Sequence, residues 1–171
     1  MSHIRTGDAI YPGWTFPTTV TSSLKIFQDI VPLDKNWSNY MINTYGLRPW
    51  YTVLFYRPAR FYDTMAHVDI VPGDKSKILD AIVINWVWGG RNSDMVWYEM
   101  PSHPSEVTRW DRSIGEVTYQ GWPVESLVEQ DRAEIRQIPT LTRVDLPHSI
   151  DMADQERWGL SIRFHPQGHS S

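Results

Sequence analysis

Short stretches of alternating or continuous apolar residues, separated by glycine and proline, fill the chain from residue 50 onward. Alternation with a period of two is typical of strands that are half buried, and a short continuous apolar run is typical of a strand buried on both faces. The predicted strands cover 50–57, 66–71, 80–88, 94–100, 116–119, 140–150 and 157–164. Many short strands with such punctuation favour a β-sandwich or barrel. We therefore predict a mainly β fold, most simply a jelly roll, over residues 50–165.

The first 49 residues carry weaker and more mixed patterns than the rest of the chain. Four apolar residues repeat at the helical period and predict a short amphipathic helix that ends at Pro32: Leu24, Phe27, Ile30 and Val31. A second short helix is predicted at 36–45, stopping at Gly46. The polar stretch 124–135 is compatible with a helix or with a long loop, and the sequence leaves both open.

The chain of 171 residues is most simply a single domain, with residues 166–171 as a frayed tail. Hydrophobic residues make up 41% of the chain and charged residues 21%, which is typical of a globular protein rather than a disordered one. No apolar run approaches the roughly 20 residues that span a bilayer, and the first residues lack a signal-peptide pattern. We therefore expect a cytoplasmic protein that does not enter a membrane.

Charge and cysteine content narrow the chemistry further. The formal net charge is −4 and the basic residues are scattered, which disfavours a nucleic-acid substrate. The chain has no cysteine, which excludes disulfides and thiolate metal sites. A metal site in this chain therefore depends on histidine and carboxylate side chains.

A His-x-Asp pair, His67 and Asp69, lies in the predicted strand 66–71, and His148 lies in the predicted strand 140–150. Because residues i and i+2 of a strand point to the same side, the pair would project into one cavity, and the second histidine must come from another strand alongside. The pair alone is equally consistent with an ordinary histidine on a strand surface. Its apolar neighbours favour a buried position, where a carboxylate needs a partner or a metal. Two histidines and one carboxylate on one face of the ion are the ligand set of non-haem Fe(II) oxygenases.

The triad and the segment 157–164 (Arg-Trp-Gly-Leu-Ser-Ile-Arg-Phe) together resemble the 2-oxoglutarate/Fe(II)-dependent oxygenases. Within that superfamily the chain resembles the small bacterial and phage members, which are distantly similar to aspartyl/asparaginyl β-hydroxylases. The most specific part is Leu-Pro-His-Ser-Ile at 146–150, followed by a short polar turn and Arg-x-x-Leu-Ser-Ile-Arg-Phe. The resemblance covers about residues 50–165 and does not extend to the first 45.

This resemblance implies a double-stranded β-helix (jelly roll) in which His67, Asp69 and His148 hold Fe(II). It also implies that 2-oxoglutarate fills two of the remaining coordination positions and that dioxygen takes the third. The expected reaction hydroxylates an unidentified small molecule, amino acid or peptide side chain, while 2-oxoglutarate is converted to succinate and CO₂.

The far carboxylate of 2-oxoglutarate needs a buried cation, and arginine suits it because a guanidinium binds a carboxylate through two parallel hydrogen bonds. Arg157 and Arg163 are the candidates. They lie on one face of the same predicted strand, so the alternation does not separate them, and only the resemblance, through the spacing from His148, favours Arg157. Asn85 is a further candidate, because an amide in an apolar strand must find partners. The cosubstrate is one such partner, although a backbone partner is favoured.

Two other classes of protein remain open on the sequence. A cupin-like metalloenzyme would use the same triad without 2-oxoglutarate, and neither arginine would then bind a cosubstrate. A non-catalytic jelly-roll module, structural or for assembly, would carry the His/Asp pattern by coincidence or as a relic. The downstream arginine counts against the first alternative and the complete triad against the second, whereas the fold alone does not distinguish them.

Overall fold

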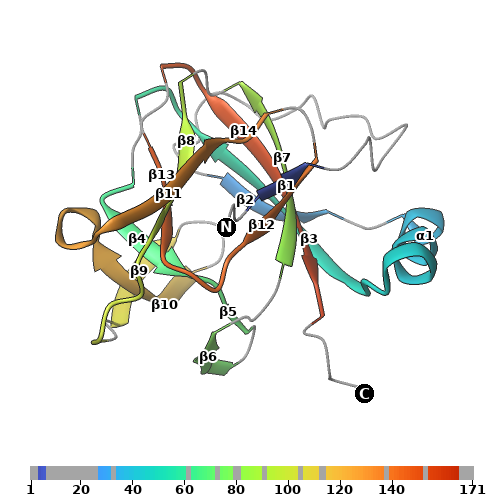
Figure 1. Cartoon of the computed structure of the whole chain (residues 1–171), viewed down its shortest axis with the longest axis horizontal. Coiled ribbons are helices and arrows are strands. Elements are labelled where there is room, and N and C mark those ends of the chain that lie inside the picture. The colour runs from blue at the N-terminus through green and yellow to red at the C-terminus, as the bar shows by residue number, and fades with distance from the viewer. Residues whose placement is uncertain are drawn as a thin grey trace.

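The computed structural model describes residues 4–6, 27–31, 34–60, 63–71, 74–78, 82–89, 92–103, 106–111, 115–136, 139–151 and 154–165. Within these residues the chain forms two six-stranded antiparallel sheets, a small two-stranded sheet and one α-helix (Figure 1). The fold is mainly β, as the sequence predicts, and its two large sheets are consistent with a β-sandwich.

The first large sheet, called sheet A, has the strand order β1-β12-β7-β14-β3-β2. In that order its strands are Ile4–Thr6, Thr140–Arg143, Ile82–Gly89, Arg157–Phe164, Pro49–Arg57 and Phe27–Val31. The central strand β14 forms long ladders with β7 on one side and β3 on the other. Its side chains are therefore held in a fixed register with both neighbours.

The second large sheet, called sheet B, has the strand order β11-β8-β13-β4-β10-β9. In that order its strands are Glu129–Glu134, Asp94–Tyr98, His148–Ile150, Met65–Val68, Gly115–Pro123 and Glu106–Asp111. The small sheet pairs β5 (Ile70–Val71) with β6 (Asp74–Ile78), and a 3-10 turn covers Val124–Ser126. Sheets A and B contact each other through a buried cluster of Val87 from β7 with Met95 and Trp97 from β8.

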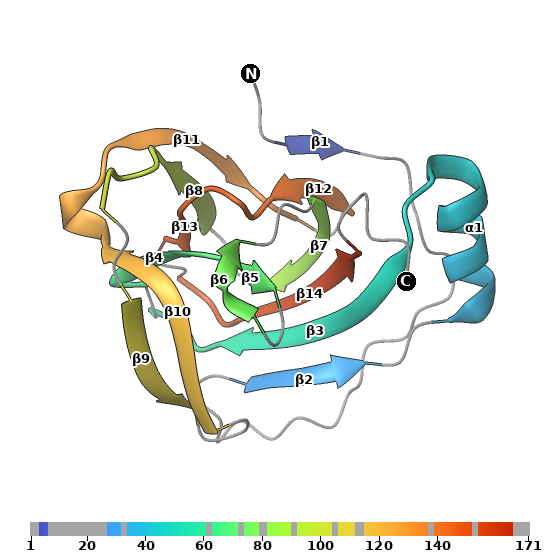
Figure 2. The same ribbon diagram turned by 90° about the horizontal axis from the view of Figure 1, so that it is seen from below.

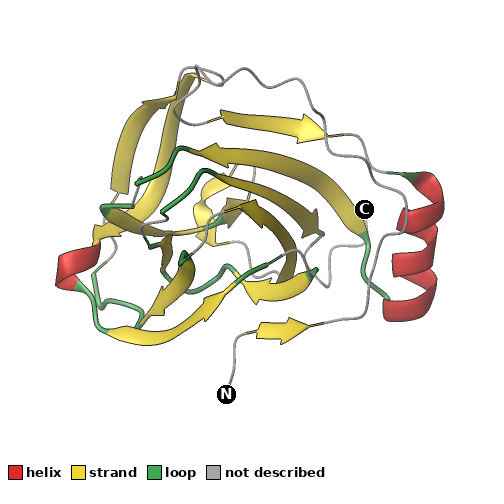
Figure 3. Ribbon diagram, turned by 90° about the horizontal axis from the view of Figure 1, so that it is seen from above, coloured by secondary structure: helices red, strands yellow, loops and turns green. Residues whose placement is uncertain are grey.

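The helix α1 (Lys35–Tyr45) is bounded by two local signals. The Asp34 carboxylate accepts the Trp37 N–H at 2.8 Å, which caps the first turn. Gly46 ends the helix in the left-handed conformation, at φ 67°, and donates its N–H to the Met41 and Ile42 carbonyls. Figures 2 and 3 show α1 at the end of the molecule opposite the β9–β10 hairpin. In the described part of the chain, no helix has the length and apolar character that crossing a membrane requires.

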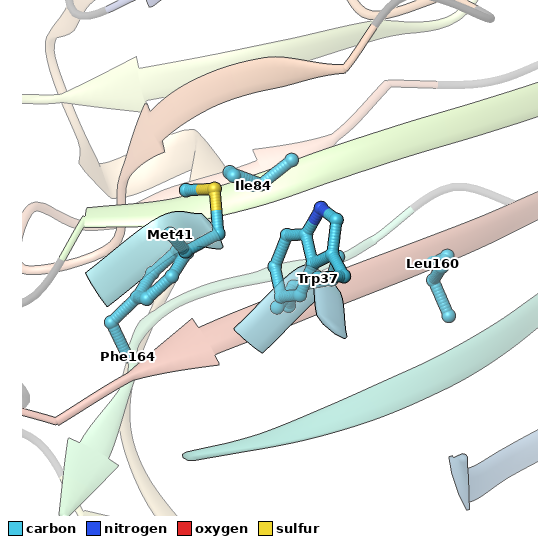
Figure 4. Packing of buried hydrophobic residues seen from close by; sticks show 6 residues of the cluster. Trp37, Met41, Ile84, Leu160 and Phe164 are labelled. Atoms are coloured by element: carbon cyan, nitrogen blue, oxygen red, sulfur yellow. The ribbon is translucent and has the colours of Figure 1, made fainter. Parts of the chain in front are cut away.

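Alternation along β14 separates a core face from a polar face. Leu160, Ile162 and Phe164 belong to one buried cluster with Trp37 and Met41 of α1 (Figure 4). The Trp37 and Phe164 rings lie 6.4 Å apart, at a tilt of 35°. Because neighbouring residues of a strand point to opposite faces, β14 presents its intervening residues to the side away from the helix.

The sequence prediction for β14 is confirmed, and so is the helix that stops at Gly46. The predicted helix through Leu24 and Val31 is wrong where the structure describes it, because 27–31 form strand β2 at the edge of sheet A. Pairing with β3 supplies backbone hydrogen bonds that outweigh the apparent helical period of a few apolar residues. Residues 24–26 of that predicted helix lie outside the described residues.

Two further predictions are corrected by sheet pairing. The stretch 124–135 is neither an α-helix nor a long loop. After the 3-10 turn at Val124–Ser126, β11 pairs with β8 as an edge strand whose exposed side chains make the segment polar. The predicted strand 140–150 is two strands, since β12 joins sheet A and β13 joins sheet B. The chain crosses from one large sheet to the other between them.

Two glycines with positive φ give a matched test of this fold. Gly46→Ala places a Cβ in open space and should lower the free energy of unfolding by about 1–2 kcal/mol, the penalty of the left-handed conformation. Gly89→Ala, at φ 70°, also places its Cβ 2.2 Å from the Glu156 carbonyl oxygen and should remove about 3 kcal/mol or more. Urea denaturation of both variants measures the difference. Equal losses would contradict the close approach of β7 to the start of β14.

Candidate metal centre

His67, Asp69 and His148 lie together although His148 follows Asp69 by 79 positions along the chain. His67 on β4 is the register partner of His148 on β13, and their ring centroids are 4.6 Å apart. One ligand atom from each of the three residues lies within 4.8 Å of the others. The Asp69 Oδ1 atom is 3.8 Å from His67 Nε2 and 3.9 Å from His148 Nε2. Since metal–ligand bonds of about 2.0–2.2 Å put neighbouring ligand atoms about 3 Å apart, the group is close enough to hold one ion.

Asp69 is not part of a continuous strand, so the predicted strand 66–71 is wrong at this position. β4 ends at Val68 and β5 begins at Ile70, and the Asp69 N–H donates to the Val144 carbonyl at 3.0 Å. The backbone thus leaves sheet B at the carboxylate and bonds to the segment that follows β12. This local break, rather than strand alternation alone, places the Asp69 side chain beside His67.

The environment of His148 suits a metal ligand. Its side chain is buried, and Nδ1 lies 2.9 Å from the Leu146 carbonyl oxygen, which makes Nδ1 the protonated nitrogen and leaves Nε2 facing Asp69. Burial lowers the pKa of His148, while the Leu146 hydrogen bond acts in the opposite direction. The ring is therefore held neutral near pH 7, the state that binding a metal requires.

Arg163 is engaged with the triad itself. Its Nη1 forms an ion pair with Asp69 Oδ2, and both side chains are largely buried. The guanidinium offsets the charge of the carboxylate and fixes its position, as groups behind a metal ligand commonly do. Arg163, which the sequence analysis names as a candidate for binding the cosubstrate, therefore contacts the candidate metal ligand Asp69.

A pocket of about 640 Å³ of empty space, its open mouth included, adjoins the triad between the two large sheets. His67 and His148 line it from sheet B. β14 lines it from sheet A with four alternate residues: Arg157, Gly159, Ser161 and Arg163. The polar face of β14 is therefore the face that closes the pocket.

Arg157 is the pocket residue whose surroundings most clearly suit an anionic ligand. It is only 6% exposed, and among the described residues it forms no hydrogen bond or ion pair. Burial, together with the Arg57 guanidinium, lowers the pKa of Arg157 to about 9, so the group stays protonated at neutral pH. Burying an unpaired cation is unfavourable, and an anion in the pocket would offset that cost.

Two pocket residues escape sequence analysis. Arg57 on β3 is the direct register partner of Arg157, and its Nη1 donates to Asp63 Oδ1 at 2.5 Å. Asp63 also accepts the Ile150 N–H through Oδ2 at 2.9 Å, which ties this ion pair to β13. No motif marks either residue, because their role depends on strand register and on a turn, and neither is visible in spacing.

Asn85 lies in the pocket wall on β7, but its partner differs from the one expected. Its Nδ2 donates to Thr142 Oγ1 at 2.6 Å and lies 3.9 Å from Met95 Sδ. The favoured backbone partner is therefore wrong, and a side-chain hydroxyl from β12 takes that place. Asn85 thus links β7 to β12 at the edge of the pocket.

The chain matches no protein-family model, and no curated protein is significantly similar to it.

Loss of one metal ligand should strongly weaken metal binding and leave the fold intact. We expect His148→Ala to weaken binding of Fe(II) or Mn(II) by more than about 100-fold, because two of three ligands do not hold the ion. Anaerobic isothermal titration measures the affinity, and a thermal melt checks the fold. The matched control is His103→Ala, since His103 is exposed and lies outside the triad. Equal metal affinity in the two variants would show that the triad is not a metal centre.

Proposed function

We propose that this chain is a non-haem Fe(II)- and 2-oxoglutarate-dependent dioxygenase that hydroxylates a small molecule, an amino acid or a peptide side chain. The observation that carries the proposal is the pairing of two features in one pocket. A His-Asp-His group lies at one side, and a buried arginine with no hydrogen-bond partner among the described residues lies in the same pocket. The first suits a metal ion and the second suits the carboxylate of a ligand.

The donor set fits Fe(II). His67 and His148 supply neutral nitrogens and Asp69 supplies one carboxylate, the ligand combination typical of non-haem iron oxygenases. When bound, the iron with 2-oxoglutarate and dioxygen would supply the oxidation of a C–H bond, with succinate and CO₂ as coproducts. The chain's own residues then have three tasks: to bind these groups, to orient them and to exclude water.

The charge of the pocket suits a dianion. Three arginines, Arg57, Arg157 and Arg163, stand against two aspartates, Asp63 and Asp69, so the pocket and triad carry a net charge of one positive unit with both histidines neutral. A divalent ion raises this excess to three. 2-Oxoglutarate carries two negative charges and would remove most of it, because opposite charges attract strongly where water is excluded.

The two arginines of β14 have different roles in this proposal. Arg157 holds the far carboxylate of 2-oxoglutarate, since its buried Nε has no hydrogen-bond partner in the described part of the chain and a guanidinium binds a carboxylate through two parallel hydrogen bonds. Arg163 keeps the Asp69 carboxylate in place and acts as a positioning residue. Val87 and Val144 supply apolar walls that limit the access of water.

The strand order supports a jelly roll as the scaffold. Without the added strands, sheet A reads β12-β7-β14-β3 and sheet B reads β11-β8-β13-β4. Along the chain, these eight strands change sheet at each step except between β8 and β11, as the double Greek key of a jelly roll requires. In this arrangement the two histidine ligands come from sheet B, Asp69 comes from the break directly after β4, and the cosubstrate arginine comes from sheet A.

The proposal predicts separate effects for the two arginines. With the metal bound under anaerobic conditions, Arg157→Ala should weaken 2-oxoglutarate binding by about 100-fold, because a charge-assisted bidentate contact is lost. It should leave the metal affinity nearly unchanged and should not lower the melting temperature, since the lost cation has no hydrogen bond or ion pair within the described residues. Arg163→Ala should weaken the metal affinity itself. Isothermal titration with each ligand measures both.

The matched control is Arg136→Ala, because Arg136 is exposed and pairs only with Glu134 among the described residues. Unchanged 2-oxoglutarate affinity in Arg157→Ala, with loss in Arg163→Ala, would reassign the carboxylate to Arg163. A wild-type protein that binds the metal but not 2-oxoglutarate would overturn the proposed cosubstrate. The cupin-like alternative would then account for the site.

A further inference from the structure

Gly159 occupies a place where the backbone does not require glycine. It lies in the middle of β14, paired with Val87 on β7 and Phe55 on β3, and its φ is not in the left-handed region. Gly89 is different, because its positive φ and the nearby Glu156 carbonyl both exclude a side chain. Glycine weakens the interior of a strand, so its presence at 159 calls for another reason.

The space above Gly159 opens into the pocket. A Cβ at this position would meet no heavy atom within 4 Å. The flanking pocket residues on the same face are Arg157 and Ser161, both buried. Neither Arg157 Nε nor Ser161 Oγ has a hydrogen-bond partner among the described residues. Unfilled pocket space at Gly159 thus lies between two polar side chains that would each bind a ligand.

From this geometry we infer that Gly159 is a specificity-determining residue, whose missing side chain leaves room for the carbon chain of a short dicarboxylate held by Arg157. The inference rests on the proposed function and deepens it. The carboxylate is recognised by charge, and the unbranched chain behind it is recognised by the space that only glycine leaves. Any larger residue at 159 would point into that space, because alternate residues of β14 face the pocket.

A graded series of side chains tests the inference. Gly159→Ala should weaken 2-oxoglutarate binding to the Mn(II)-loaded protein by about 10-fold, and Gly159→Val by about 100-fold or more, because each added carbon overlaps the ligand chain. The metal affinity should stay within about twofold of wild type, since Gly159 is not a ligand. The melting temperature should be unchanged or higher, because alanine and valine suit a strand better than glycine.

Gly46→Ala is the matched control. It makes the same chemical change far along the chain from β14, destabilises the protein, and should leave 2-oxoglutarate affinity at the wild-type value. This variant separates a general loss of stability from a blocked pocket. Anaerobic isothermal titration with Mn(II) alone, and then with 2-oxoglutarate, provides both affinities without turnover.

The outcomes separate the two proposals. If wild type binds 2-oxoglutarate and Gly159→Val binds it equally well, the role of Gly159 is overturned while the proposed function stands. Parallel loss of Mn(II) and 2-oxoglutarate binding in Gly159→Val would also overturn it, because the glycine would then serve the structure of the site as a whole. If wild type binds Mn(II) but no 2-oxoglutarate, the proposed function fails and the inference fails with it.

Discussion

The register of β14 is the constraint on which the site and the core both depend. Leu160, Ile162 and Phe164 pack against α1 on one face, while the intervening residues line the pocket on the other. A shift of one residue would place arginines in the apolar cluster and leucine or phenylalanine in the pocket. Long ladders to β7 and β3 prevent such a shift. Burial of the apolar face therefore stabilises a strand whose other face carries buried charge.

Because of that buried charge, the positive and negative side chains of the pocket do not fully neutralise each other in the protein without a ligand. Arg57 has Asp63 as its partner and Arg163 has Asp69, but Arg157 has no such partner among the described residues. Stability gained by the apolar core offsets the penalty of holding this cation away from water. A site that is unfavourable without its ligand and favourable with it is a common arrangement where binding is the function. The same reasoning applies to Gly159, which weakens its strand and leaves space beside that cation.

The sequence predicts those elements that have a local pattern. It does not predict contacts that depend on which strands pair and in which register. The alternation in 157–164 predicts β14 because every second residue is apolar and neither end of the segment is a glycine or a proline. The positions of His67 and His148 could be predicted as neighbours only in general terms, since the exchange of strands between sheets is not encoded in any short segment. Arg57 was invisible for the same reason, because only the β3–β14 pairing places it opposite Arg157. The helical period in 27–31 does not predict the edge strand β2, since its hydrogen bonds come from β3, a separate segment of the chain.

The most direct test of the account is an anaerobic titration of the purified protein with Fe(II) and then 2-oxoglutarate, followed by visible absorbance. A ligand that binds the iron through its keto oxygen and carboxylate gives a weak metal-to-ligand charge-transfer band. If iron and 2-oxoglutarate bind together at the triad, this band requires both additions and is absent when His148 is replaced by alanine. Iron binding with no band at saturating 2-oxoglutarate would contradict it, because the metal centre and the anion pocket would then not act on one ligand.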